Sequence, residues 1–261
     1  MQKFLEIRDE RDYCEWRIAR PDRLNGIGTT LAAELAGALA ELKARPKLPT
    51  ALVLTATPVV KGPRRTWLAG GDLKELQELK TGTEARRYAV ALSDFLSGLD
   101  ELPIPVVVAV DGAAICGGAE LALGGDVRLA TSASSWEFKQ LRVGLATGYG
   151  SARRLVELVG LGKAQGLLYR GATVSASEAL NLGLVHQVVA DEGALREACR
   201  TVSAEFALLG PETLAAQKRM FWHATHSHPG AARAAEAELF TKLWLNPAHA
   251  RFLAAFNRPK S

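Results

Sequence analysis

The run of aliphatic residues Val106–Val110 constrains the fold most, because a short continuous apolar stretch bounded by turn signals is typical of a buried strand. A glycine pair, Gly117-Gly118, follows a few residues later, and the helix-like run Leu121–Leu123 comes soon after it. Strands and helices in alternation predict crossover connections around a mainly parallel sheet. We therefore expect an α/β fold.

The N-terminal part of the chain shows the same alternation. Strands are expected at Lys3–Ile7, Tyr13–Ala19 and Ala51–Thr55. A helix is expected after Thr29 or Thr30, either of which suits the N-cap position. A further helix over residues 84–102 has an apolar face made of Leu92, Phe95, Leu96 and Leu99.

Helical patterns dominate the C-terminal part of the chain. Ser175 and Glu178 have the spacing of a capping box, Pro211 suits the first turn of a helix, and Ser227–Gly230 separates the last two long helices. We expect an α/β core in residues 1–200 and a helical C-terminal region in residues 201–261. The apolar side of that region carries Leu239, Phe240, Leu243, Trp244, Phe252 and Phe256.

Composition and charge exclude several classes of protein. Among 261 residues, 48% are hydrophobic and 23% are charged, which suits a folded globular chain. The net charge of +4 is spread without a basic block or stripe, so we expect no nucleic-acid partner. The apolar stretch Pro103–Val110 is too short to cross a bilayer, and charges interrupt the N-terminus before a signal-peptide core can form. We therefore expect no membrane partner.

Cysteine usage favours a reducing, cytoplasmic compartment. Cys14, Cys116 and Cys199 lie far apart and are odd in number, so they offer neither a disulfide framework nor zinc spacing. The clustered residues His223, His226 and His228 lack matched carboxylates or cysteines, so we expect no metal site.

Two glycine pairs carry the clearest functional signal. Gly70-Gly71 and Gly117-Gly118 each precede a helix-like run. Glycine allows close backbone approach, and free N–H groups at the start of a helix attract anions. Two such groups aimed at one oxygen would form an oxyanion hole. A single pair is more often a tight turn used for steric reasons, and neither pair fits a phosphate-binding fingerprint.

With their flanking residues, these pairs resemble the crotonase family, the enoyl-CoA hydratase/isomerase superfamily. The segments that carry the resemblance are Arg20–Ile27, Trp67–Leu73, Pro105–Leu123 with Asp126, Gly144–Leu155, Gly171–Val189 and Ala255–Pro259. The resemblance covers nearly the whole chain, and its third segment is the most specific.

The resemblance implies a crotonase-like spiral of ββα units with a helical C-terminal trimerisation region, assembled as a homotrimer or a dimer of trimers. It implies an acyl-CoA thioester as substrate, with coenzyme A entering as part of the substrate and no separate cofactor. The N–H groups of Gly71 and Gly117 would donate to the thioester oxygen. Negative charge collects there when an α-proton is removed or water adds to a conjugated double bond.

Family hydratases use two glutamates, which map onto Glu120 and Gln140. Glu120 suits either catalysis or the acidic first turn of a helix. An amide cannot take up a proton at neutral pH, so Gln140 cannot be the second acid–base group. Glu137 would replace it only if the alignment slips, whereas Trp136 fits the family's aromatic position without a gap.

The substitution at Gln140 leaves the reaction open. It puts two-carboxylate hydration and isomerisation in doubt, while family members that decarboxylate or hydrolyse acyl-CoA substrates lack the second acid and keep the oxyanion hole. Gln140 would then bind a substrate carboxylate or water. A catalytically weak CoA-binding subunit is a further alternative.

The resemblance also places the coenzyme. Leu24 and Gly26 would lie near the adenine and ribose, while Arg65 and Lys74 would meet the phosphates. A solvated basic loop explains the two cations equally well. Ala69, Trp136 and Tyr149 complete the expected substrate contacts, and Lys260 is expected to reach the site of another subunit.

Overall fold

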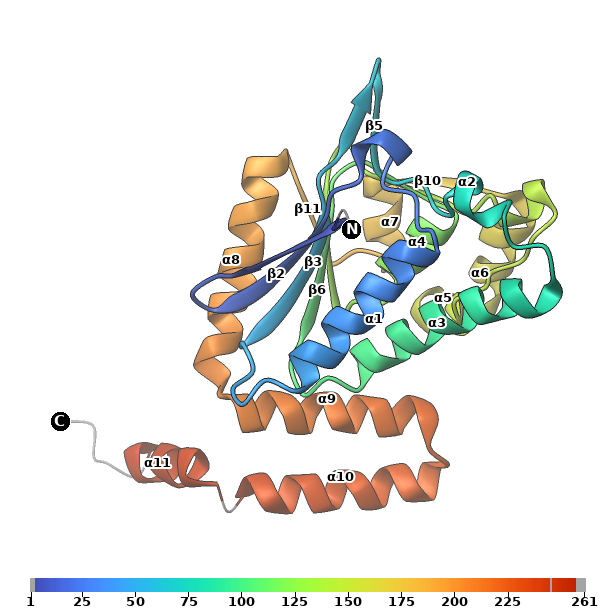
Figure 1. Cartoon of the computed structure of the whole chain (residues 1–261). Helices are drawn as coiled ribbons and strands as arrows, with labels where there is room; N and C mark the ends of the chain where they lie inside the picture. Colours follow the sequence, from blue (N-terminus) through green and yellow to red (C-terminus); the bar gives the residue numbers. More distant parts are fainter. Residues whose placement is uncertain (1–2, 245, 257–261) are drawn as a thin grey trace.

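The computed structural model describes residues 3–244 and 246–256, with backbone only for the last five of these. Its larger sheet has the strand order β1-β2-β3-β6-β8-β11, with β1 antiparallel to β2 and every other neighbour parallel (Figure 1). The strands are β1 Leu5–Asp9, β2 Tyr13–Ile18, β3 Ala51–Ala56, β6 Val106–Val110, β8 Val127–Thr131 and β11 Gln187–Val189. The prediction of a mainly parallel α/β sheet is confirmed.

A smaller sheet has the order β10-β9-β7-β5-β4. Its strands are β4 Val59–Lys61, β5 Arg64–Leu68, β7 Ala113–Ile115, β9 Ser135–Glu137 and β10 Thr173–Ser175. The three inner strands β5, β7 and β9 are mutually parallel, and the two outer strands are antiparallel to their neighbours. The carboxyl ends of the inner strands therefore share one edge of the sheet.

Helices cover both faces of the larger sheet. Helices α1 (Thr29–Lys43) and α3 (Gly82–Asp100) lie on one face, and α8 (Glu192–Leu209) lies on the other (Figure 1). Side chains of β3 alternate accordingly, since Leu52 and Leu54 enter the main core while Val53 packs on the α8 side. All four residues of the apolar face expected on α3 are buried.

The start of α1 differs from the prediction. Gly28 occupies the N-cap position without a side-chain hydrogen bond, so neither Thr29 nor Thr30 caps the helix. The Thr30 N–H instead donates to the Glu75 carboxylate at 3.1 Å. The cap comes from a residue distant in sequence, which local propensity does not reveal.

The remaining elements agree with the expected C-terminal pattern. The Ser175 capping box is present, and Pro211 opens α9 (Pro211–His226), which ends before the break at Ser227. The remaining helices are η1 Pro21–Arg23, α2 Leu73–Leu76, α4 Gly117–Ala122, η2 Gln140–Val143, α5 Ser151–Val159, α6 Leu161–Arg170, α7 Ala176–Leu182, α9 Pro211–His226, α10 Pro229–Trp244 and α11 Pro247–Phe256.

The C-terminal helices extend away from the sheets (Figure 1). Because α8 runs unbroken through residue 200, the boundary between residues 1–200 and 201–261 stays a prediction. Phe240 and Trp244 of α10 are more than half exposed. The side chains of Phe252 and Phe256, and Lys260 as a whole, lie outside the described residues.

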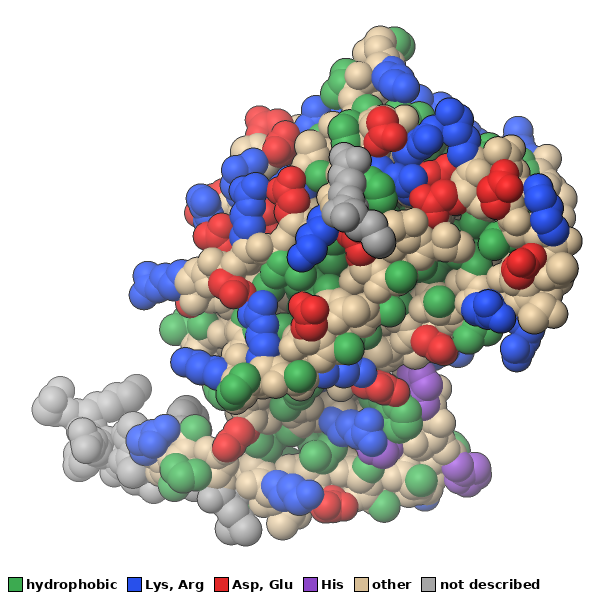
Figure 2. All heavy atoms as spheres, viewed as in Figure 1, with side chains coloured by type: hydrophobic (Ala, Val, Ile, Leu, Met, Phe, Trp, Pro, Cys, Tyr) green, Lys and Arg blue, Asp and Glu red, His purple; other side chains and the backbone are tan. Residues whose placement is uncertain are grey.

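Charges of both signs are interspersed over the face seen in Figure 2, without a block of one sign. No described helix is long and apolar enough to span a membrane. Within the same residues, no group of three or more His, Cys, Asp or Glu side chains could hold a metal ion.

A buried lysine ties α9 to the core. The Lys218 ammonium donates to the carbonyl oxygens of Leu99 at 2.8 Å and Ile104 at 2.9 Å, and pairs with Asp126 at 2.7 Å. These acceptors surround the C-terminal end of α3, where helix carbonyls lack partners within the helix and attract cations. One ammonium group therefore fixes α9 against the end of α3.

We expect Lys218→Met to lower the free energy of unfolding by about 2–3 kcal/mol, because three charge-assisted hydrogen bonds are lost from a buried position. Lys242→Met is the matched control, since Lys242 and Glu238 are both 68% exposed and such pairs contribute less than about 1 kcal/mol. Urea denaturation measures both values. Equal losses in the two variants would contradict a special role for Lys218.

Candidate active site

Three of the predicted site residues follow the three inner strands of the smaller sheet. Gly71 comes after β5, Gly117 after β7 and Gln140 after β9. Because the carboxyl ends of these parallel strands share one edge, residues from three distant segments meet there. The edge is therefore the candidate active site.

A buried ion cluster holds the first of these segments. Arg20 Nη2 lies 2.7 Å from Asp72 Oδ2 and 2.7 Å from Glu75 Oε1. The second oxygen of Glu75 accepts the Thr30 N–H and a hydroxyl proton from Thr29 at 3.0 Å. The residues that follow Gly71 are thereby fixed to the start of α1.

The loop before α1 has an unusual backbone. Leu24 and Asn25 both have φ above +50°, a left-handed conformation that side chains disfavour. The buried Asn25 side chain compensates, because its amide donates to Thr57 and Trp67 carbonyls and its oxygen accepts the Arg20 N–H. The Leu24 carbonyl accepts the Ala69 N–H at 3.1 Å, so this loop is joined to the segment before Gly71.

The two glycine turns approach each other closely. Gly70 has φ +87°, and a Cβ atom built on it would lie 2.6 Å from the Ile115 carbonyl oxygen and 3.1 Å from the Gly117 nitrogen. No side chain fits there. Within residues 3–244 and 246–256, neither the Gly71 N–H nor the Gly117 N–H donates to a protein acceptor. Two unpaired donors thus lie in adjoining turns.

The second glycine turn, between β7 and α4, depends on the backbone conformation of Cys116. Its φ of +48° and ψ of −113° lie outside the regions that L residues normally adopt, and its N–H donates to the Glu137 carbonyl at 2.8 Å. Such strain needs support from its surroundings and tends to occur at functional sites. The turn makes Gly117 the first residue of α4.

Glu120 lies on α4, and its buried carboxylate accepts three hydrogen bonds. Oε2 accepts the N–H groups of Gly148 and Tyr149, both at 3.0 Å, and Oε1 accepts the Gln140 side-chain amide at 3.1 Å. Both Glu120 and Gln140 are about 95% buried. One carboxylate therefore joins α4 to the start of η2 and to the end of the loop between η2 and α5.

The ungapped alignment over Trp136–Gln140 agrees with this geometry. Gln140 faces Glu120, whereas Glu137 pairs with Arg64 and Lys139 instead. The Gln140 Oε1 atom is buried and has no hydrogen-bond partner among the described residues. Since its Nε2 already donates to a carboxylate, Oε1 is an unpaired acceptor that can take a hydrogen bond from a ligand or water.

Tyr149 adjoins Gly117, and Tyr88 adjoins Tyr149. A Cβ atom built on Gly117 would lie 2.8 Å from the Tyr149 hydroxyl oxygen, so glycine is needed for this approach. The Tyr149 and Tyr88 hydroxyl oxygens are 2.6 Å apart. Sequence reasoning missed Tyr88, because its place on α3 carries no motif.

The residues expected to contact the substrate and its coenzyme differ in their exposure and in their partners. Lys74 is exposed, while Ala69 is half-buried beside the Gly70 turn. Arg65 instead pairs with Asp111 and with Glu192, which does not support a free phosphate ligand. Trp136 is completely buried in the core, which leaves no surface for a substrate contact in this arrangement.

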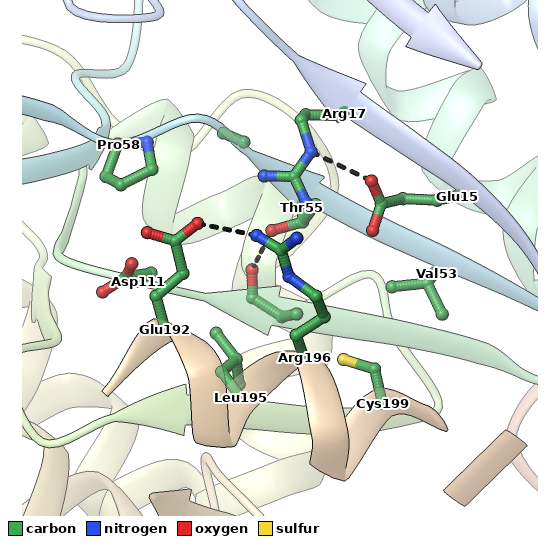
Figure 3. Close-up of a pocket in the computed structure, with 12 residues that line it drawn as sticks. Glu15, Arg17, Val53, Thr55, Pro58, Asp111, Glu192, Leu195, Arg196 and Cys199 are labelled. Carbon is green, nitrogen blue, oxygen red and sulfur yellow. Dashed lines mark hydrogen bonds and ion pairs between the residues drawn. The ribbon is translucent and has the colours of Figure 1, made fainter. Parts of the chain in front are cut away.

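A separate hollow lies on the α8 side of the larger sheet (Figure 3). Arg17 pairs with Glu15 there, and Arg196 pairs with Glu192. Its volume of about 20 Å³ holds roughly one water molecule. Because α2 and α4 lie on the other side of that sheet, this hollow is not part of the candidate site (Figure 1).

Comparison with known proteins identifies the family. The enoyl-CoA hydratase/isomerase family model matches residues 10–253, so the chain belongs to this family. The short-chain-enoyl-CoA hydratase of Clostridium acetobutylicum is 31% identical over 172 residues, which cover 66% of this chain and 63% of that protein. The crotonyl-CoA hydratase of Syntrophomonas wolfei is 31% identical over 180 residues, which cover 69% of this chain and 66% of that protein.

Solved structures agree over a longer span. An enoyl-CoA hydratase from Mycobacterium smegmatis has a TM-score of 0.88 and 26% identity, covering 98% of this chain and 96% of that one. The predicted family and crotonase-like fold are therefore confirmed. The prediction of an enzyme of the enoyl-CoA hydratase/isomerase type is confirmed at the level of the family, which leaves the exact reaction open.

The Glu75 cluster predicts a pH-dependent stability. Burial raises the pKa of Glu75, but hydrogen bonds from Thr30, Thr29 and Arg20 outweigh it and hold the pKa below its ordinary value of 4.5. A lowered carboxyl pKa stabilises the folded state above the unfolded-state value, and the gain is lost as pH falls through the folded-state value. Wild type should therefore exceed Glu75→Gln in stability at pH 6–7, and the difference should shrink below pH 4.5.

Urea midpoints of both proteins between pH 7 and pH 3.5 or so measure this difference. Glu78→Gln is the matched control, because the Glu78 side chain is 69% exposed and its loss should change stability little. A Glu75→Gln deficit that grows on acidification would contradict the assignment.

Proposed function

We propose that the protein is an acyl-CoA-processing enzyme in which the N–H groups of Gly71 and Gly117 stabilise the enolate of a thioester. The observation that carries this proposal is the pair of unpaired backbone donors in adjoining turns. Gly117 is the first residue of α4, where a free N–H favours a developing negative charge. Family membership supports the acyl-CoA substrate class.

Glu120 is the acid–base group of this proposal. Its three hydrogen bonds leave carboxylate lone-pair capacity for one more donor, such as a water molecule. Gln140 Oε1 would accept the other hydrogen of that water. Since an amide takes up no proton, Glu120 alone would remove the proton from water and return one to the α-carbon.

The second candidate is a decarboxylase or hydrolase of an acyl-CoA, and the Gln140 side chain is the observation that favours it. Loss of CO₂ from the substrate yields the same enolate without removal of a proton by a base. This reaction therefore does not need a second carboxylate at the site. A third hypothesis is a CoA-binding subunit with little activity, and the same assays test it.

The C-terminal helices support a homotrimer or a dimer of trimers. Phe221, Phe240 and Trp244 are 62%, 58% and 54% exposed on α9 and α10, which is costly for large apolar side chains in water. A neighbouring subunit would cover them. We further propose a cytoplasmic protein that uses no cofactor beyond the coenzyme A of its substrate and no nucleic-acid or membrane partner.

A matched pair of substitutions at Gly71 tests the oxyanion donor. Gly71→Ala keeps the N–H and adds a Cβ atom that meets only the flexible end of Leu76. Gly71→Pro adds the Cβ atom as part of a ring that replaces the N–H. We expect kcat to fall by about 10²–10³ more in Gly71→Pro than in Gly71→Ala. Equal activity of the two folded variants would contradict the donor role.

Substrate assays with a Gln140→Glu variant separate the reactions. We expect the wild type to hydrate crotonyl-CoA, and Gln140→Glu to raise the rate about tenfold or more, because a second acid–base group is restored beside Glu120. Glu120→Gln should abolish hydration in both backgrounds. Release of CO₂ from a malonyl-type thioester, without hydration of crotonyl-CoA, would instead establish the decarboxylase.

A further inference from the structure

The hydroxyl groups of Tyr88 and Tyr149 form a short hydrogen-bonded chain. Tyr88, on α3, donates to the Ile27 carbonyl at 2.7 Å, and its oxygen lies 2.6 Å from the hydroxyl oxygen of Tyr149. A phenol has one proton to donate. Since Tyr88 uses its proton on Ile27, Tyr149 supplies the proton of the second bond.

The outer end of this chain adjoins the oxyanion site. The Tyr149 ring edge packs on Gly117 so closely that a Cβ atom there would lie 2.8 Å from both Cε2 and the hydroxyl oxygen. The backbone of Tyr149 is fixed by its hydrogen bond to Glu120. The Tyr149 hydroxyl therefore lies next to the residue whose N–H would hold an anionic oxygen.

The chain can reverse its direction without leaving a carbonyl unpaired. The Ile27 carbonyl also accepts the Asp72 N–H at 3.0 Å, so it keeps a partner when Tyr88 turns its proton toward Tyr149. Tyr149 is then free to donate to a new acceptor. An anion favours this reversed direction, because charge-assisted hydrogen bonds are stronger than neutral ones and a chain of them is cooperative.

We propose that the Tyr149 hydroxyl is a third hydrogen-bond donor to the enolate oxygen beside Gly117, and that Tyr88 is a positioning residue that acts through Tyr149. This inference rests on the proposed function and adds to it. It assigns a role to two side chains that the backbone oxyanion hole does not require.

The protonation of the two phenols agrees with a donor role. Burial raises the pKa of Tyr88 to about 12 and raises the pKa of Tyr149 well above its ordinary value. Both side chains therefore keep their protons at neutral pH. They serve as donors and not as bases.

The experiment uses acetoacetyl-CoA, a thioester whose enolate form absorbs ultraviolet light. Wild type, Tyr149→Phe, Tyr88→Phe and the double variant are compared for the enolate fraction bound at pH 7, with binding of free CoA as a second readout. Phenylalanine keeps both rings in place. Tyr169→Phe is the matched control, because Tyr169 is 73% exposed.

We expect Tyr149→Phe to lower the enolisation constant of the bound ligand about 10- to 100-fold, the effect of one hydrogen bond to a charged group. Tyr88→Phe should lower it less and should add nothing in the Tyr149→Phe background, because Tyr88 acts through Tyr149. Affinity for free CoA should stay unchanged in all variants.

The outcomes separate this inference from the proposed function. If wild type binds acetoacetyl-CoA without enriching its enolate, the proposed oxyanion function fails. If wild type enriches the enolate and Tyr149→Phe does so equally, the third donor is overturned. Additive losses in the double variant would overturn the positioning role of Tyr88.

Discussion

The candidate site depends on the parallel pairing of β5, β7 and β9. Parallel neighbours place their carboxyl ends at one edge, so Gly71, Gly117 and Gln140 meet although they are far apart in the chain. The close approach of the turns then requires glycine, since a Cβ on Gly70 would collide with the Ile115 carbonyl. Strand pairing thus explains why two glycine pairs occur where they do.

Glu120 supplies the second constraint. Its carboxylate accepts two backbone N–H groups and the Gln140 amide, so the loop that carries Tyr149 is held against α4 by one side chain. Removing that carboxylate would leave buried donors unpaired, which is costly. The structural and catalytic interpretations of Glu120 are therefore compatible.

The sequence predicted the parts of the molecule that depend on local pattern. The buried strand Val106–Val110, the apolar face of α3 and the Ser175 capping box are examples. The glycine turns were found because their motif is specific. The contacts of Glu75, Tyr88 and Lys218 were not found, because each joins segments more than 40 residues apart and leaves no local signal. The same reason explains the wrong N-cap of α1.

An amide at position 140 in place of a carboxylate changes the electrostatics of the site as well as the number of groups that can carry a proton. Two carboxylates at the 3.1 Å that separates Gln140 Nε2 from Glu120 Oε1 would repel, and one of them would hold a proton at neutral pH. The Gln140 amide donates instead, so hydrogen-bond donors face both oxygens of the Glu120 carboxylate. In the proposed mechanism Glu120 is therefore the one carboxylate base, and Gln140 only orients. A hydration reaction in such a site depends on Glu120 for both proton transfers, whereas an enolate formed by loss of CO₂ needs only the donors around Gly117.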